Sequence, residues 1–275
     1  MELWFTERQN EAMSFSLRVR ATLHHEKTPY QRLDVLDTEQ YGRVLTLDGM
    51  VMTTEADEFV YHEMIVHVPL CIHPRPRRVL IVGGGDGGAV REALRHPEVE
   101  RVDLVEIDRA VVEASRRFFP QLSAGLSDPK VRVVEADGIA FVAEHSAAYD
   151  CVLVDSTEPV GPAVGLFEPA FFRSVERALA PGGIMVAQTE SPFVNGELIR
   201  RVQRGLREIF PVVRLYLASV PTYPSGLWSF SLAGREVDPE RFREPTLNTR
   251  YYSPQVHRAA FALPPFVREL TEAAP

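Results

Sequence analysis

The stretch Val79-Leu80-Ile81-Val82-Gly83-Gly84-Gly85-Asp86-Gly87-Gly88 decides the fold of this chain. Four apolar residues, three of them β-branched, run directly into five glycines that surround one aspartate. A short, continuous apolar run closed by glycine predicts a strand that is buried on both faces. Residues 89–94 then follow a helical pattern, so the glycines form a strand-to-helix turn that a ligand can approach closely.

Downstream of this turn, strand and helix patterns alternate. Strands are predicted at residues 79–82, 102–106, 131–136, 151–154, 184–187, 212–217 and 228–232, and a helix at 197–209. A possible capping box at residues 54–57 opens an earlier helix that ends before Pro74. Alternation of this kind specifies a mostly parallel sheet with helices on both faces. We therefore predict an α/β fold, with a seven-stranded, Rossmann-like catalytic domain over residues 57–275.

The N-terminal part of the chain has a different pattern. Apolar and polar residues alternate over residues 15–54, with turn signals at 28–29, 41–42 and 48–49. This predicts a small antiparallel β module over residues 1–56. A sheet of this size is marginal alone, so it should pack on the main domain or on another copy of itself.

Composition narrows the classes of partner. The chain has 275 residues, is 45% hydrophobic and carries a net charge of -8, which argues against nucleic acid or an anionic membrane. Cys71 and Cys151 lie in apolar runs and are predicted to be core residues. Residues 1–10 lack the features of a signal peptide, and no apolar run approaches the roughly 18 residues of a membrane helix. We expect a cytoplasmic protein.

Acidic residues stand where the predicted strands end. Asp86, Glu106, Asp137 and Asp155 each follow a strand, and ligands of such sheets bind outside these carboxyl ends. Each acid alone could equally cap a helix, but together they converge on one crevice. Glu106 lies about 20 residues after the glycine turn, where nucleotide folds place an acid on the ribose hydroxyls.

The glycines also match the dinucleotide fingerprint, so an NAD enzyme has to be considered. An acid inside the loop would repel a pyrophosphate, because two unit charges 4 Å apart interact by about 4 kcal/mol at an effective dielectric of 20. An acidic crevice suits a cationic nucleoside instead, and the obvious one is a sulfonium. Methyltransferases of this fold usually carry an acid inside the first strand, where this chain has Ile81.

Eight motifs along the chain together point to one family: residues 28–31, 57–64, 79–88, 105–108, 135–138, 155–162, 222–226 and 250–253. Through these motifs the chain resembles the spermidine synthases, the polyamine aminopropyltransferases, and is most similar to their short bacterial members. The resemblance implies a methyltransferase-like fold and transfer of an aminopropyl group from decarboxylated S-adenosylmethionine to putrescine, giving spermidine and methylthioadenosine. It also implies a homodimer or homotetramer, and a nucleoside that acts as co-substrate, with no permanently bound cofactor.

Residue roles are carried over motif by motif. The adenosine is held or covered by Gln31, Glu106, Asp137, Gly138 and Pro162, and Asp86 binds the ammonium of the aminopropyl chain. The amine channel and the attacking nitrogen are lined by Tyr61, His62, Asp155, Glu158 and Tyr223, with Asp155 as the base. Many family members have Asp where this chain has Glu158. The longer side chain changes the length of the amine site, so the resemblance does not fix the length of the acceptor.

The chemistry of the reaction supports these roles. Decarboxylation leaves the donor with an ammonium that Asp86 attracts, whereas the same carboxylate repels ordinary S-adenosylmethionine. An alkylamine is almost fully protonated at pH 7, so a base such as Asp155 has to take its proton before attack at carbon. Proline and glycine in residues 159–165 suggest a mobile lid.

Several alternatives remain. Cadaverine, agmatine or spermidine could be the acceptor, and a methyltransferase or a non-catalytic polyamine or nucleoside sensor is a further possibility. The acids and histidines of residues 57–67 fit no defined metal-ligand spacing, so we predict no metal.

Overall fold

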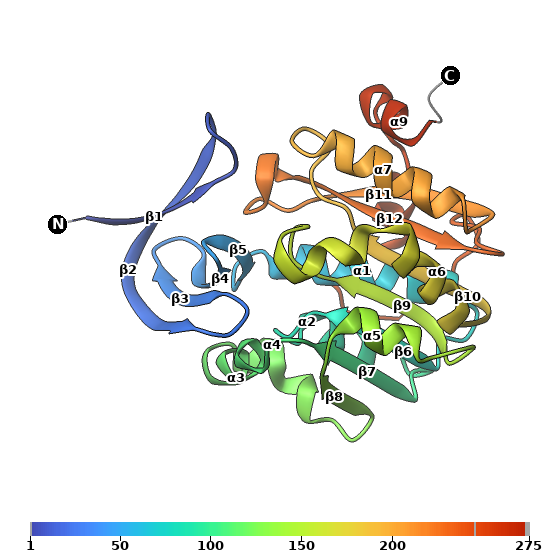
Figure 1. Ribbon diagram of the computed structural model, residues 1–275, viewed down its shortest axis with the longest axis horizontal. Coiled ribbons are helices and arrows are strands. Elements are labelled where there is room, and N and C mark those ends of the chain that lie inside the picture. Colours follow the sequence, from blue (N-terminus) through green and yellow to red (C-terminus); the bar gives the residue numbers. More distant parts are fainter. Residues whose placement is uncertain (1, 245, 273–275) are drawn as a thin grey trace.

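The computed structural model describes residues 2–244 and 246–272, which form two sheets (Figure 1). The expected domain limits at residues 1 and 275 lie outside this range. The first sheet is antiparallel throughout, with its strands in chain order: β1 (Leu3–Arg8), β2 (Ser14–Lys27), β3 (Arg32–Thr38), β4 (Gly42–Leu47) and β5 (Met50–Thr54). The predicted antiparallel module is confirmed, and β1 extends it upstream of the segment in which the pattern was visible.

The second sheet contains all seven strands that the sequence predicts. They are β6 (Arg78–Gly83), β7 (Arg101–Glu106), β8 (Val131–Glu135), β9 (Tyr149–Asp155), β10 (Leu179–Gln188), β11 (Val212–Ser219) and β12 (Leu227–Gly234). Among the described residues their order is β11-β12-β10-β9-β6-β7-β8, parallel from β10 to β8 and antiparallel where β12 joins β10 and β11. The prediction of a mostly parallel sheet is therefore confirmed.

Helices cover both faces of this sheet, as expected for a buried parallel strand such as β6. Val79 and Ile81 of β6 pack in one apolar cluster, with α1 (Glu58–Ile72), α2 (Gly88–Leu94) and α8 (Pro254–Ala260). Leu80 and Val82 point the other way, into a cluster with α5 (Gly138–Ala143), α6 (Pro169–Ala178) and α7 (Gly196–Arg207). All four side chains are at most 2% exposed, which explains their unbroken apolar run. The last helix, α9 (Pro265–Thr271), packs on α7.

The start of α1 differs from the capping box expected at residues 54–57. The helix begins at Glu58, and the side chain of its N-cap residue, Asp57, makes no capping hydrogen bond. Asp57 instead accepts hydrogen bonds from the hydroxyl of Thr54 and from both the backbone N–H and the hydroxyl of Thr222. The carboxylate therefore ties the loop after β11 to the junction between the two sheets, a partner 165 positions away that local sequence cannot reveal.

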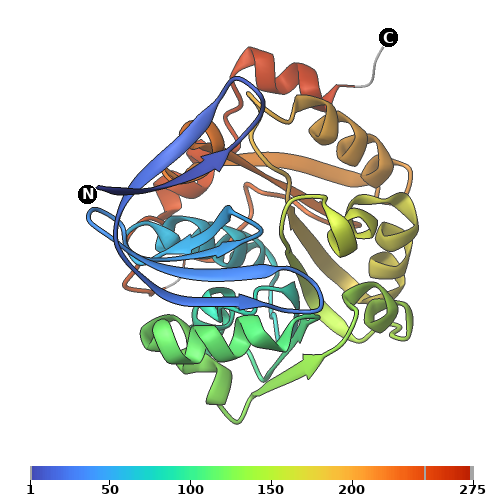
Figure 2. The same ribbon diagram turned by 60° about the vertical axis from the view of Figure 1, so that its left-hand side comes forward.

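The N-terminal sheet packs on the main domain through part of its surface. Side chains of β3 and β4, among them Leu33 and Leu45, contact Val111 and Phe118 of α3 (Arg109–Phe118), next to α4 (Pro120–Ser123). Figure 2 shows this sheet from the side on which β1 and β2 extend past the main domain. Those two strands expose the large apolar side chains Leu3, Trp4 and Leu23. Within residues 2–244 and 246–272, no helix combines the length and apolar character needed to cross a membrane.

Candidate active site

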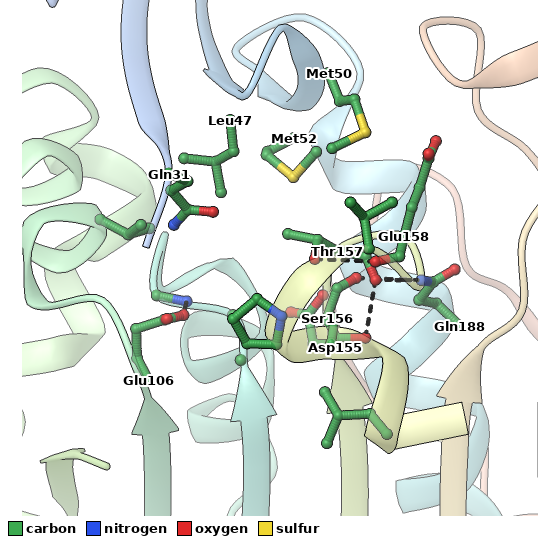
Figure 3. A pocket seen from close by; sticks show the side chains of 18 of the residues that line it. Gln31, Leu47, Met50, Met52, Glu106, Asp155, Ser156, Thr157, Glu158 and Gln188 are labelled. Atoms are coloured by element: carbon green, nitrogen blue, oxygen red, sulfur yellow. Dashed lines mark hydrogen bonds between the residues drawn. The ribbon is translucent and has the colours of Figure 1, made fainter. Parts of the chain in front are cut away.

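A cavity opens between the carboxyl ends of the central parallel strands and the N-terminal sheet (Figure 3). The eleven residues that the sequence singles out all line it: Gln31, Tyr61, His62, Asp86, Glu106, Asp137, Gly138, Asp155, Glu158, Pro162 and Tyr223. The wall facing the strand ends comes from the N-terminal module, with Leu47, Met50 and Met52. The cavity is thus formed within one chain. The strand ends and the segment over residues 159–165 form only part of its wall, and the N-terminal module supplies the rest.

Two polar side chains from different domains lie at one end of the cavity. Glu106, at the end of β7, accepts hydrogen bonds from the backbone N–H groups of Gly85 (3.2 Å) and Asp108 (2.9 Å). Gln31, from the loop before β3, donates to the carboxylate of Asp108 at 2.9 Å. Burial raises the pKa of Glu106 to about 7, although its backbone bonds oppose the shift. Asp108, which lies in one of the motifs but received no role, is what holds Gln31 in place.

Asp137 caps a helix and also faces the cavity. It caps α5 by accepting a hydrogen bond from the backbone N–H of Ile139 at 2.7 Å, and it also lines the rim of the cavity. The following Gly138 lies against β6, because a Cβ atom there would stand 2.5 Å from Val82. Pro162 belongs to a 3₁₀ helix over Gly161–Phe167, within the segment predicted as a lid.

The glycine turn brings two strand ends unusually close together. Gly84 has a φ of 66°, and a Cβ atom on it would stand 2.7 Å from Oδ2 of Asp155. Only glycine fits both the backbone angle and the space. The turn also directs Asp86 into the cavity, where one oxygen accepts the N–H of Gly88 (2.7 Å) and the other lies 3.4 Å from Nε2 of His62.

Asp155 lies at the centre of the cavity with one oxygen engaged and one free. Oδ1 accepts a 2.7 Å hydrogen bond from the hydroxyl of Tyr61. Oδ2 is buried and has no hydrogen-bond partner among the described residues. Burial and the nearby Asp86 raise the pKa of Asp155 to about 6, against the opposing effect of His62 and Tyr61. A carboxylate with a free lone pair and a pKa near neutrality can accept a proton from a group that enters the cavity.

Aromatic rings form the wall beside Asp155. Tyr61 packs edge-to-face on Tyr223, with ring centroids 5.6 Å apart. Tyr223 donates its hydroxyl hydrogen to the carbonyl of Met52 at 2.6 Å, which fixes the ring against the N-terminal module. Trp228 packs at a tilt against Tyr223, with ring centroids 4.6 Å apart; it is buried in the core and also lines the cavity.

The opposite end of the cavity is acidic. Glu158 is joined there by two acids to which sequence reasoning gave no role, Glu7 from β1 and Glu190 just after β10. Burial, opposed by a hydrogen bond from Val51, raises the pKa of Glu7 to about 7. Burial and repulsion from Glu158 raise the pKa of Glu190 to about 8.

Two buried polar atoms that line the cavity make no hydrogen bond with the described residues. Within residues 2–244 and 246–272, neither Oε2 of Glu190 nor Nε1 of Trp228 has a hydrogen-bond partner. Gln188 braces the wall by donating to the carbonyls of Ser156 and Thr157 (Figure 3). Carboxylates that repel one another in a buried space are matched by a ligand that brings positive charge.

Glu190 follows a strand end and was visible in the sequence as an unassigned acid. Glu7 gave no signal in the sequence, because it lies on β1, upstream of the segment in which strands were predicted and far from the other motifs. The acids and histidines at residues 57–67 separate into unrelated contacts, and the described residues contain no group of three or more His, Cys, Asp or Glu placed to hold a metal.

Comparisons with known proteins find relatives along the whole chain. The spermidine synthase tetramerisation domain matches residues 3–55, and the spermine/spermidine synthase domain matches residues 58–243. The chain is 55% identical over 273 residues to the polyamine aminopropyltransferase of Thermoanaerobacter sp. (strain X514), covering 98% of this chain and 99% of that protein. It is also 55% identical over 274 residues to the polyamine aminopropyltransferase of Moorella thermoacetica, covering 98% and 97% of the two chains.

Solved structures give the same result. A spermidine synthase in complex with the transition state analogue AdoDATO matches with a TM-score of 0.94 at 38% identity, over 98% of this chain and 94% of that one. The spermidine synthase from Thermotoga maritima matches with a TM-score of 0.93, also at 38% identity and with the same coverage.

Proposed function

The chain belongs to the spermine/spermidine synthase family of polyamine aminopropyltransferases, and from this membership we propose that it transfers the aminopropyl group of decarboxylated S-adenosylmethionine to putrescine. The products are spermidine and methylthioadenosine. The observation that carries the proposal is the placement of carboxylates along one cavity, with Glu106 at one end, Asp86 and Asp155 in the middle and three glutamates at the other end. This order matches a nucleoside, a reacting centre and a distal ammonium.

The donor occupies the end near Glu106. Its ribose hydroxyls donate to Glu106, which is braced by two backbone N–H groups, and Gln31 and Asp137 flank the adenosine. Asp86 binds the ammonium of the aminopropyl group, so a donor that keeps its carboxylate is disfavoured. Pro162 covers the nucleoside when the segment over residues 157–166 closes.

The acceptor occupies the acidic end. Its far ammonium is bound among Glu7, Glu158 and Glu190, where buried acids repel one another in the absence of a cation. Its near nitrogen faces Asp155, with Tyr61 and Tyr223 alongside. A diamine fits this arrangement because it carries one positive charge for each end of the channel.

The transfer step follows from these positions. The near ammonium gives a proton to the free oxygen of Asp155, and its lone pair then attacks the aminopropyl carbon next to the sulfonium. The C–S bond breaks, and its electron pair goes to sulfur, which becomes the neutral thioether of methylthioadenosine. Tyr61 holds the other oxygen of Asp155, so the carboxylate keeps its orientation during the proton transfer.

We further propose that the chain works as a homo-oligomer assembled through residues 1–56. The match to a tetramerisation domain over residues 3–55 supports this, as do the apolar side chains that β1 and β2 expose. Residues 1–56 also cover the active site, since Gln31, Met52 and Glu7 line the cavity.

One assay tests the activity directly. The protein is mixed with decarboxylated S-adenosylmethionine and, separately, with putrescine, cadaverine, agmatine or spermidine, and methylthioadenosine is quantified. We expect the highest kcat/KM with putrescine. Highest efficiency with another amine would disprove the acceptor assignment, and absence of methylthioadenosine with every amine would disprove the transfer itself.

A further inference from the structure

His62 is clamped between two carboxylates behind the reacting centre. Its Nδ1 lies 2.6 Å from Oε2 of Glu58, and its Nε2 lies 3.4 Å from Oδ2 of Asp86. The ring is almost completely buried, with 3% of the side chain exposed. When both ring nitrogens face carboxylate oxygens, only the imidazolium can donate to both of them.

Glu58 is itself held rigidly. Arg91 of α2 donates from both terminal nitrogens to the two oxygens of Glu58, at 3.0 and 2.9 Å, a fork that fixes the carboxylate plane. Nε of Arg91 donates to Glu92 at 2.8 Å, which anchors the arginine in turn. The ring of His62 lies flat against Gly88, where a Cβ atom would stand 2.3 Å from Cε1 of the imidazole. The histidine therefore has very little freedom to turn away from its two partners.

The charged and titratable groups around His62 come from four elements. Glu58 and Tyr61 lie on the same helix, Asp86 lies on the loop after β6, Asp155 ends β9, and Arg91 stands behind Glu58 on α2. Burial by itself would lower the pKa of the imidazole, but Asp86 and Glu58 carry that pKa well above its usual value. The positive ring opposes the rise in the pKa of Asp155 that burial and Asp86 cause.

We propose that Glu58, braced by Arg91, is a positioning residue that keeps His62 charged, and that this charge keeps Asp155 ionised at neutral pH. This inference rests on the proposed function, in which Asp155 accepts the proton of the amine. The imidazolium supplies a fixed positive charge beside Asp86, and this charge offsets the repulsion that Asp86 exerts on Asp155. The same charge disfavours the ammonium form of the near nitrogen and so helps it to lose its proton.

The first test is the pH dependence of kcat at saturating donor and putrescine. Removing a nearby opposite charge raises a carboxylate pKa by about 1–2 units. In Glu58→Gln we therefore expect the acidic limb of the profile of kcat against pH to move to higher pH by that amount. At an assay pH one unit above the wild-type limb, kcat then falls by about twofold to tenfold, and it recovers as the pH is raised further. A merely structural loss would lower kcat by the same factor at every pH, which would overturn the proposal.

Three further variants show which residues transmit the effect to Asp155. His62→Gln should move the acidic limb to higher pH, as Glu58→Gln does. The double variant should show no additional shift, because each single change already removes the same positive charge, that of the His62 imidazolium. Glu98→Gln is the matched control: among the described residues it removes a carboxylate that pairs with Arg243 at 2.6 Å and contacts neither His62 nor Arg91, so the acidic limb of its pH profile should stay in place. An additive shift in the double variant, or an equal shift in the control, contradicts the proposal.

The second test does not depend on turnover. Imidazole ¹⁵N NMR of the ligand-free protein, with the signals of His62 assigned by their loss in His62→Gln, should show both ring nitrogens still protonated at pH 7 and above. In Glu58→Gln the ring should titrate at lower pH. A neutral His62 at pH 7 in the wild-type protein would overturn the inference, whereas a missing methylthioadenosine product would overturn only the proposed function.

Discussion

The acidic end of the cavity makes the affinity for a diamine depend on pH in a predictable way. The pKa of Glu190 is raised to about 8 and that of Glu7 to about 7, so both are partly protonated at neutral pH. For a pKa of about 8, the ionised fraction rises from about 9% at pH 7 to about 91% at pH 9. The distal ammonium of putrescine stays charged over this range, because alkylammonium groups resemble lysine, whose pKa is about 10.4.

We therefore expect the affinity for putrescine to increase about tenfold between pH 7 and pH 9. The sign follows from linkage: a carboxylate with a raised pKa becomes an anion only as the pH passes through that value, and only the anion attracts the ammonium. The assay is calorimetric titration of putrescine into the protein saturated with methylthioadenosine. The control ligand is 1-aminobutane, which has the same chain length and near amine but no distal ammonium.

The affinity ratio of putrescine to 1-aminobutane is the quantity to follow, because effects at Asp155 act on both amines and cancel. We expect this ratio to rise with pH in the wild-type protein and to become nearly constant in Glu190→Gln. Glu197→Gln, which removes an exposed glutamate of α7, should behave as the wild type. A constant ratio in the wild-type protein would refute the reasoning, since the acids would then not bind the distal ammonium.

Other predictions concern the reacting centre and the assembly. Asp155→Asn should lower turnover by about 10² or more while calorimetry shows nearly unchanged nucleoside binding; wild-type turnover would exclude Asp155 as the base. Asp86→Asn should narrow the preference for decarboxylated over ordinary S-adenosylmethionine, and an unchanged affinity ratio would contradict its contact with the ammonium. Light scattering should give a mass for the wild-type protein that is a multiple of the 30.9 kDa chain mass, and a smaller mass for Trp4→Ser. A wild-type protein that is fully active at 30.9 kDa would contradict assembly.

Much of the fold follows from local patterns in the sequence. The run at residues 79–82 predicts a buried parallel strand, and Leu80 and Ile81 are indeed completely buried against opposite faces. The antiparallel N-terminal module is equally visible, because alternation of period two and turn residues are local signals. The strand β1 was missed since it is short and contains polar residues on both faces.

The acids of the proposed reacting centre could also be predicted from the sequence, and the reason lies in the topology of the sheet. Parallel strands of one sheet share a carboxyl edge, so acids that follow different strands, such as Glu106 and Asp155, are brought together by the fold class alone. The family resemblance added Gln31, Tyr61 and Tyr223. The neighbouring residues in the sequence did not mark these three positions as functional. Tyrosines in helices and loops in particular usually serve only in packing.

The sequence by itself determined the order of strands and helices, the edge at which ligands bind and the acids that converge there, because these depend on patterns a few residues long. Only the tertiary structure revealed the contacts that set the state of each group. Glu7 reaches the acidic end from a strand more than 180 positions away from Glu190, and Asp57 accepts two of its hydrogen bonds from Thr222, 165 positions along the chain. Glu58 is positioned by Arg91 from another helix. Burial and pairing of this kind depend on what the folded chain places beside each carboxylate, and no spacing within one segment encodes that.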